Sequence, residues 1–141
     1  MGTLSCFNQA YVRAIRTGLV AGILLALGAV PLTIASASAA TVEVKMTDTP
    51  PVYLPAKLTV KSGDTVKWTN NAQTLHTVTA DPAKAVDKSD VQLPKGVAPF
   101  DSGFMMPGND FSYTFKTPGQ YKYFCIPHEK DGMIGYVTVT K

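Results

Sequence analysis

Apolar and polar residues alternate one by one along much of the chain from Thr41 onward, which is the pattern of strands that bury one face. Gly, Pro, Asn and Asp gather between these short runs and supply turns. Several short strands separated by turns are typical of two sheets packed face to face. The pattern therefore predicts an all-β sandwich. The alternating runs are residues 42–46, 58–61, 66–69, 111–116, 121–125 and 136–141.

Residues 81–99 interrupt the alternation. Three prolines and Gly96 break any long strand or helix there, and charges of both signs alternate. We expect one long irregular loop, with no more than a single helical turn at residues 83–86. Long loops without structure of their own are uncommon and are often functional.

The first forty residues have the features of a secretory signal peptide. Two arginines precede a mostly apolar run at residues 19–32, and a tract of alanine and serine follows at 35–40. The apolar run is shorter than the roughly 20 residues that a membrane span needs. We therefore expect residues 1–40 to be cleaved and residues 41–141 to form one exported domain, with no stable membrane insertion.

The predicted domain has little net charge and a single cysteine. The 13 basic residues of the chain, minus the two arginines of the predicted signal peptide, leave 11 against 10 acidic residues. No basic segment remains that would bind nucleic acid. Cys125 has no cysteine partner within the domain, so its thiol is free, paired with another chain or bound to a metal.

Three candidate metal ligands lie close together near the C-terminus. Cys125, His128 and Met133 follow a C-x₂-H-x₄-M spacing, and His76 is the other histidine of the chain. One thiolate and two imidazoles with a weak axial thioether are the ligand set of a type 1, or blue, copper site. The residues predict such a metal site, with one copper ion per chain that cycles between Cu(I) and Cu(II).

A zinc site and a thiol hydrolase are the alternatives for these residues. A thioether is a poor zinc ligand, because structural zinc sites use cysteine and histidine. His128 is three residues from Cys125, whereas thiol enzymes usually bring the base from a distant part of the chain. His76 is distant, but no nucleophile turn or substrate cleft accompanies it. We therefore predict that the chain is not an enzyme.

Beyond this ligand set, the chain resembles the plastocyanins, which are blue-copper proteins of the cupredoxin family. Val66-Lys-Trp-Thr-Asn-Asn71, followed by His76, resembles the strand that leads to the family's first ligand. The resemblance implies a cupredoxin-like Greek-key β-sandwich of about seven to eight strands. The other matching segments are Phe-Ser-Tyr-Thr-Phe at 111–115, Pro-Gly-x-Tyr at 118–121 and Cys-x-Pro-His-x₄-Met at 125–133.

The resemblance also implies a function and a docking surface. Plastocyanins carry single electrons between larger redox complexes, in photosynthesis from a cytochrome complex to photosystem I. By resemblance, the edge of His128 reaches the surface through an apolar patch, where redox proteins dock transiently to a monomer. We expect this patch to consist of Leu75, Pro127, Ile134 and Gly135.

Two positions depart from the family's pattern. Phe124 stands where typical plastocyanins have a tyrosine, which serves a remote electron-entry route beside an acidic surface. Here Lys84 and Lys88 would lie on that surface. Thr77 replaces the asparagine that often follows the first histidine, so a hydrogen bond near the ligands is expected to differ.

Alternatives to a plastocyanin-like carrier stay open. Pseudoazurin, a periplasmic electron donor, has a similar ligand spacing but continues into C-terminal helices. A copper carrier or storage protein is a different class, and Met105-Met106 is the one feature that favours it. The expected location is the thylakoid lumen or the periplasm.

Overall fold

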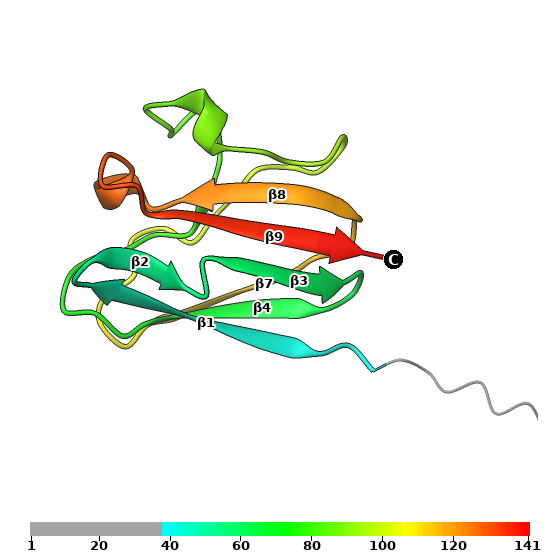
Figure 1. The fold of residues 1–141 in the computed structure, drawn as a ribbon, viewed down its shortest axis with the longest axis horizontal. Coiled ribbons are helices and arrows are strands. Elements are labelled where there is room, and N and C mark those ends of the chain that lie inside the picture. The colour runs from blue at the N-terminus through cyan, green and yellow to red at the C-terminus, as the bar shows by residue number, and fades with distance from the viewer. Residues whose placement is uncertain (1–37) are drawn as a thin grey trace, which may run out of the picture. The chain divides into compact units, whose positions relative to one another are not determined.

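Two sheets pack face to face in the computed structural model, which describes residues 38–141 (Figure 1). The predicted signal peptide lies outside the described residues, apart from its last three. One sheet has the strand order β2-β1-β4-β7 and the other β3-β9-β8-β5-β6. The first contains β1 (Thr41–Asp48), β2 (Pro51–Leu54), β4 (Thr65–Asn70) and β7 (Asp110–Thr114). The second contains β3 (Lys57–Lys61), β5 (Thr79–Ala80), β6 (Phe100–Asp101), β8 (Gly119–Phe124) and β9 (Ile134–Thr140).

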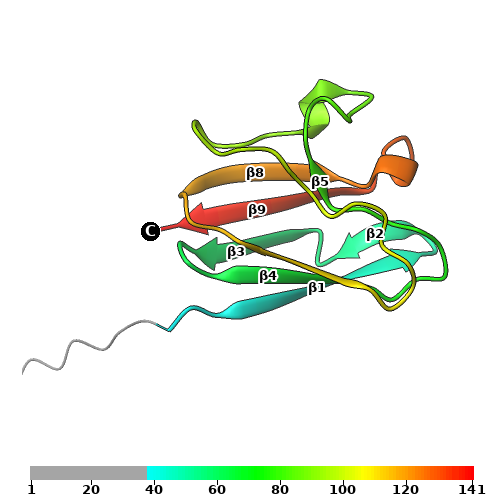
Figure 2. The ribbon, with the colours of Figure 1, turned by 180° about the vertical axis from the view of Figure 1, so that it is seen from behind.

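The predicted β-sandwich is confirmed, with more strands than expected. Each of the alternating runs forms a strand, and the inward positions of β4, Val66 and Trp68, are fully buried. The unpredicted strands are β2 and the two-residue strands β5 and β6. Of these, β5 pairs with β8 (Figure 2). β2 begins at Pro51 on the edge of its sheet, where a missing N–H breaks no ladder.

Aromatic side chains from both sheets meet in the core. The indole N–H of Trp68 donates to the hydroxyl of Tyr123 at 3.0 Å, and the ring of Tyr53 lies 4.7 Å from that of Tyr123. The hydroxyl of Tyr53 donates to the carbonyl of Thr77 at 2.6 Å. Because Thr77 follows His76, this bond ties the core to the segment that carries the first candidate ligand.

Replacing Gly135 by alanine is expected to lower the free energy of unfolding by about 1–3 kcal/mol, because overpacking a filled core costs this much. A Cβ at this position of β9 would overlap the phenol ring of Tyr123. Urea unfolding of the metal-free protein measures the change. An unchanged unfolding midpoint would show that the Tyr123 ring moves aside at no cost.

The long loop at residues 81–99 is held against β8. Gln92 and Lys122 exchange both backbone hydrogen bonds, at 3.1 and 2.9 Å, and the Lys122 ammonium lies 2.8 Å from a carboxylate oxygen of Asp90. The loop contains one 3₁₀ helix, η1 (Lys88–Asp90), above β8 in Figure 1. The helical turn that was expected at residues 83–86 is not formed. The helix begins later, at Lys88, where the Asp87 side chain accepts the N–H of Ser89 and caps it.

Candidate metal centre

His76, Cys125 and His128 come together at one end of the sandwich. Nδ1 of each histidine lies 3.5 Å from Sγ of Cys125, and the two imidazole rings are 4.7 Å apart. One ligand atom from each residue lies within 4.8 Å of the others. His76 and Cys125 are fully buried, whereas His128 is partly exposed.

Backbone hydrogen bonds link Cys125, His128 and Met133 in a closed circuit. The N–H of Cys125 donates to the carbonyl of Met133, that of Met133 to His128, and that of His128 to Cys125, at 3.0–3.1 Å. The short 3₁₀ helix η2 (Ile126–His128) forms this bend, with Pro127 in its first turn, where no N–H is needed. Gly132 has φ +78°, a conformation that glycine adopts without strain. The bend thus places three of the four predicted ligand residues on one compact loop.

The fourth predicted residue, His76, comes from the connection between β4 and β5. His76 and Met105 form an antiparallel bridge, with backbone hydrogen bonds of 3.3 and 2.9 Å. The side-chain amide of Asn70 donates to the carbonyls of Thr74 and Met105, which braces both sides of this bridge. The first histidine is therefore positioned by a segment that is rigidly attached to the sandwich.

Thr77 takes part in the hydrogen bonds around Cys125 through both its backbone and its side chain. Its N–H donates to Sγ of Cys125 at 3.3 Å, and its hydroxyl oxygen accepts the N–H of Ile126 at 2.8 Å. The Thr79 hydroxyl also lies within hydrogen-bond distance of the Thr77 hydroxyl. Threonine thus makes a direct connection to the cysteine loop at the position where the family often has asparagine.

The protonation states at this site follow from burial. Burial raises the pKa of the Cys125 thiol, against the effect of the Thr77 N–H, and burial lowers the pKa of His76. A neutral imidazole is the form that binds a metal, and metal binding deprotonates a thiol outright. A cation in the cluster would therefore stabilise the thiolate that burial alone disfavours.

The geometry of the three residues fits a first-row transition-metal ion. With metal–sulfur and metal–nitrogen bonds of about 2.3 and 2.0 Å, a near-trigonal or tetrahedral angle separates S and N by roughly 3.5 Å. The Sγ–Nδ1 distances of 3.5 Å agree with this value for both histidines. Met133 is fully buried, and its carbonyl accepts the N–H of Cys125, so it lies next to these three residues.

Three of the four residues expected in the apolar patch near His128 are at least partly exposed, and the patch itself stays a prediction. Leu75 is 42% exposed, Pro127 is exposed and Ile134 is partly exposed. Gly135 is buried against Tyr123, so the expectation that it contributes to the surface is wrong.

Two exposed apolar residues flank Met105: Phe104, which was not identified from the sequence, and Met106, which was considered only as a thioether beside Met105. Phe104 is 65% and Met106 is 59% exposed. The antiparallel bridge between His76 and Met105 places Met106 next to Leu75. Three consecutive apolar residues give no alternation that would assign Met105 to the interior, and the bridge that brings this segment to His76 is a long-range contact.

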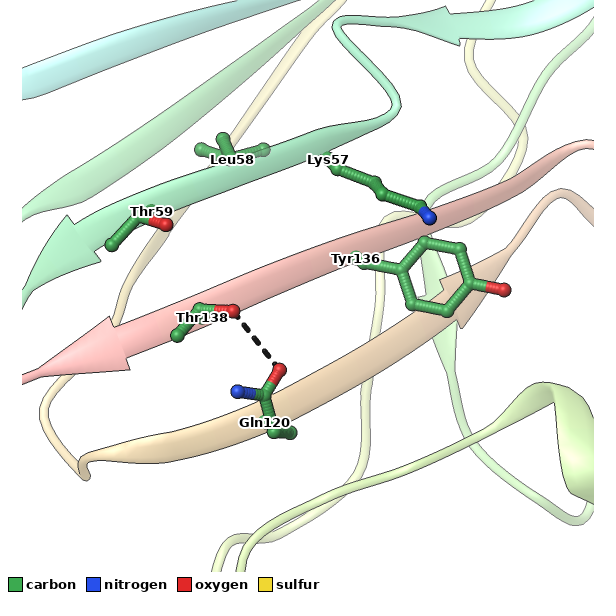
Figure 3. A pocket seen from close by; sticks show the side chains of 6 residues that line it. All are labelled: Lys57, Leu58, Thr59, Gln120, Tyr136 and Thr138. Carbon is green, nitrogen blue, oxygen red and sulfur yellow. Dashed lines mark hydrogen bonds between the residues drawn. The ribbon is translucent and has the colours of Figure 1, made fainter.

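A surface hollow of about 390 Å³ is separate from this site. It lies on the outer face of β3, β8 and β9, where the Thr138 hydroxyl donates to the side-chain carbonyl of Gln120 at 2.9 Å (Figure 3). Polar side chains line most of it, and none of the four predicted ligand residues does. The lining residues are Lys57, Leu58, Thr59, Gln120, Tyr136 and Thr138.

The fold and the buried His–Cys–His cluster define a cupredoxin-type metal protein. The sequence model of the copper-binding proteins of the plastocyanin/azurin family matches residues 40–140, and the chain belongs to this family. Its cofactor is copper, and it is a plastocyanin-like electron carrier.

Individual relatives agree with this assignment. The chain is 37% identical to plastocyanin from Prochlorothrix hollandica over 83% of its own length and 86% of that protein. It is 39% identical to plastocyanin from Nostoc punctiforme over 74% of its length and 77% of that protein. Among solved structures, pseudoazurin from Methylobacterium extorquens AM1 superposes with a TM-score of 0.58 and 25% identity, covering 72% of this chain and 76% of that one.

Proposed function

We propose that this chain carries single electrons between larger redox complexes by means of one type 1 copper ion held by His76, Cys125, His128 and Met133. The observation that carries the proposal is the buried cluster in which both Nδ1 atoms lie 3.5 Å from Sγ of Cys125. Bound copper supplies one-electron exchange between Cu(I) and Cu(II) with a thiolate, two imidazoles and a weak thioether as ligands.

The protein holds the metal-ligand atoms in fixed positions and shields most of them from water. The circuit of backbone hydrogen bonds joins Cys125, His128 and Met133, and the bridge to Met105 holds His76, so no large movement is needed when the charge of the site changes. His76 and Cys125 are shielded from water. The partly exposed ring of His128 is the path between this interior and a bound partner.

The visible spectrum of the copper-loaded protein tests this function. A type 1 site is expected to give an intense blue band, since the thiolate of Cys125 donates charge to Cu(II). A protein that binds Cu(II) and stays colourless would contradict the type 1 assignment. A reversible one-electron potential, measured on the same sample, would support a carrier that is not an enzyme.

The partners are proposed to be redox proteins that dock transiently at the apolar surface around His128. By analogy with the plastocyanin relatives, they are a cytochrome complex and photosystem I, and the location is the thylakoid lumen or the periplasm. The same surface and location would serve a pseudoazurin-like donor. No helix among residues 38–141 is long and apolar enough to cross a membrane.

A copper carrier or storage protein receives no support from Met105-Met106. Met105 is 3% exposed and Met106 is 59% exposed, so they do not form an open pair of thioethers. A ligand set built into a rigid sandwich also exchanges metal poorly. Slow copper release together with a stable potential would distinguish the electron carrier from the metal carrier.

Replacing Met133 by leucine is expected to keep the blue copper and to raise the reduction potential. A weak axial ligand contributes little to holding the ion, but it donates electron density that stabilises Cu(II). The measurement is the potential and copper content of both proteins. Loss of copper from the variant, under conditions where the wild type stays loaded, would show that Met133 is needed for binding.

A further inference from the structure

The carboxylate of Asp48, at the end of β1, lies beside the candidate ligand His76. One of its oxygens is 3.1 Å from Nε2 of His76, on the opposite side of the ring from the nitrogen that faces Cys125. The same oxygen accepts the hydroxyl of Thr74 at 2.5 Å, and the other accepts the N–H of Gln73 at 2.6 Å. Nothing in the sequence marked Asp48, because it lies 28 residues before His76.

These hydrogen bonds hold the carboxylate of Asp48 against the ring of His76. An aspartate carboxylate is ordinarily ionised at neutral pH, and the Thr74 hydroxyl and the Gln73 N–H hold its two oxygens in place. An ionised carboxylate has no proton to donate, so His76 must carry its proton on Nε2. The lone pair of Nδ1 is then directed toward Cys125, which is the tautomer that a metal in the cluster requires.

The carboxylate also places a fixed negative charge at the back of an uncharged ligand. His76 is fully buried, and the Asp48 side chain is only 25% exposed, so water screens their interaction incompletely. A nearby negative charge favours Cu(II) over Cu(I), because the oxidised ion carries one more positive charge. This stabilisation of Cu(II) requires only that His76 binds the ion through one ring nitrogen and contacts Asp48 through the other.

We propose that Asp48 is a positioning residue that fixes the tautomer and orientation of His76 and lowers the reduction potential of the bound copper. This inference rests on the proposed type 1 site. The ring nitrogens have separate roles: Nδ1 binds the metal, and Nε2 donates to Asp48. Ligand histidines in metal proteins often have such a carboxylate partner, which orients the ring and raises its basicity.

Two substitutions separate the charge from the hydrogen bond. Asp48→Asn retains a side-chain oxygen that accepts from Nε2 but removes the charge, whereas Asp48→Ala removes both. Asp64→Asn is the matched control, since its carboxylate also accepts two backbone N–H groups, from Ala40 and Lys61, but precedes β4 at the end of the strand away from His76.

The first measurement is the reduction potential of the copper-loaded proteins. Both Asp48 variants are expected to stay blue and to favour Cu(I) about tenfold more than the wild type does, a rise of about 59 mV for one electron. The control is expected to stay within a small fraction of that change. A potential of Asp48→Asn equal to that of the control would overturn the electrostatic part of the proposal.

The second measurement needs no copper. Nitrogen-15 NMR of the metal-free protein reports which ring nitrogen of His76 carries the proton. We expect Nε2–H in the wild type and in Asp48→Asn, and a mixture of tautomers in Asp48→Ala. Unmixed Nε2–H in Asp48→Ala would overturn the positioning role. A wild type that never turns blue with copper would contradict the proposed function instead, while these signals would still decide whether Asp48 fixes the tautomer.

Discussion

Replacing Cys125 by serine is expected to abolish the blue absorption of the copper-loaded protein completely. The band requires charge transfer from a thiolate to Cu(II), and Cys125 is the one cysteine among residues 38–141. A serine hydroxyl does not ionise at neutral pH and is a poor ligand for a soft ion. Absorption spectra at equal copper loading measure the effect.

The variant is nevertheless expected to fold. The core depends on large side chains such as Trp68, Tyr53 and Tyr123, which the substitution leaves in place. The serine oxygen would occupy the position of the sulfur, where the N–H of Thr77 already donates. The stability cost is expected to be about 1–3 kcal/mol, the range for a buried hydroxyl with incomplete hydrogen bonding. A variant that folds and keeps the blue band would exclude Cys125 as the ligand.

The sequence was sufficient to predict the sandwich and to group Cys125, His128 and Met133 on one loop, because both depend on local patterns. Strands such as β4 and β9 alternate buried residues with partly or fully exposed ones, and burial of one face selects that alternation. Cys125, His128 and Met133 lie within one short loop, so their spacing already limits how far apart they can be. Their convergence with His76 is confirmed for both histidines and the cysteine. The metal bond of Met133 stays a prediction.

The errors and omissions arise from contacts between distant segments. Asp48 lies next to His76 because β1 pairs with β4 in parallel, so that the two strands end on the same side of the sheet. The alternation of residues along a strand does not predict which strands pair. Gly135 was expected on the surface because it follows a ligand loop, but the pairing of Gly135 with Tyr123 across β9 and β8 turns it inward. Phe104 was missed for the same reason.

The attachment of the 81–99 loop also depends on a contact between distant segments. Its irregularity was evident from its prolines, but its attachment was not. The buried carboxylate of Glu129 accepts the N–H groups of Val86 and Asp87 at 2.9 and 2.8 Å, so the residue after His128 anchors the loop. A glutamate in a charged segment is normally solvated, and only the fold shows that this one is not.

The second large effect concerns where electrons cross to a partner. Ile134→Glu is expected to slow electron exchange with a redox partner about tenfold or more. Ile134 opens β9 and follows Met133, whose N–H donates to the carbonyl of the partly exposed His128. A carboxylate there would have to lose its water on docking without gaining a partner, which weakens the complex. Leu75→Glu, next to His76, is expected to slow electron exchange as well.

Val86→Glu is the comparison variant, because Val86 is 73% exposed and lies on the 81–99 loop between Lys84 and Lys88, which were expected on the remote electron-entry surface. Electrons are not expected to enter there: Phe124 is fully buried and lacks a phenol, and the Lys84 ammonium is already paired with Asp101 at 2.5 Å.

The near balance of charge in residues 41–141 also gives little long-range steering, so the rates should depend only modestly on salt. Stopped-flow rate constants for the three variants decide the matter. A larger loss from Val86→Glu than from Ile134→Glu and Leu75→Glu would move the docking surface from His128 to the loop.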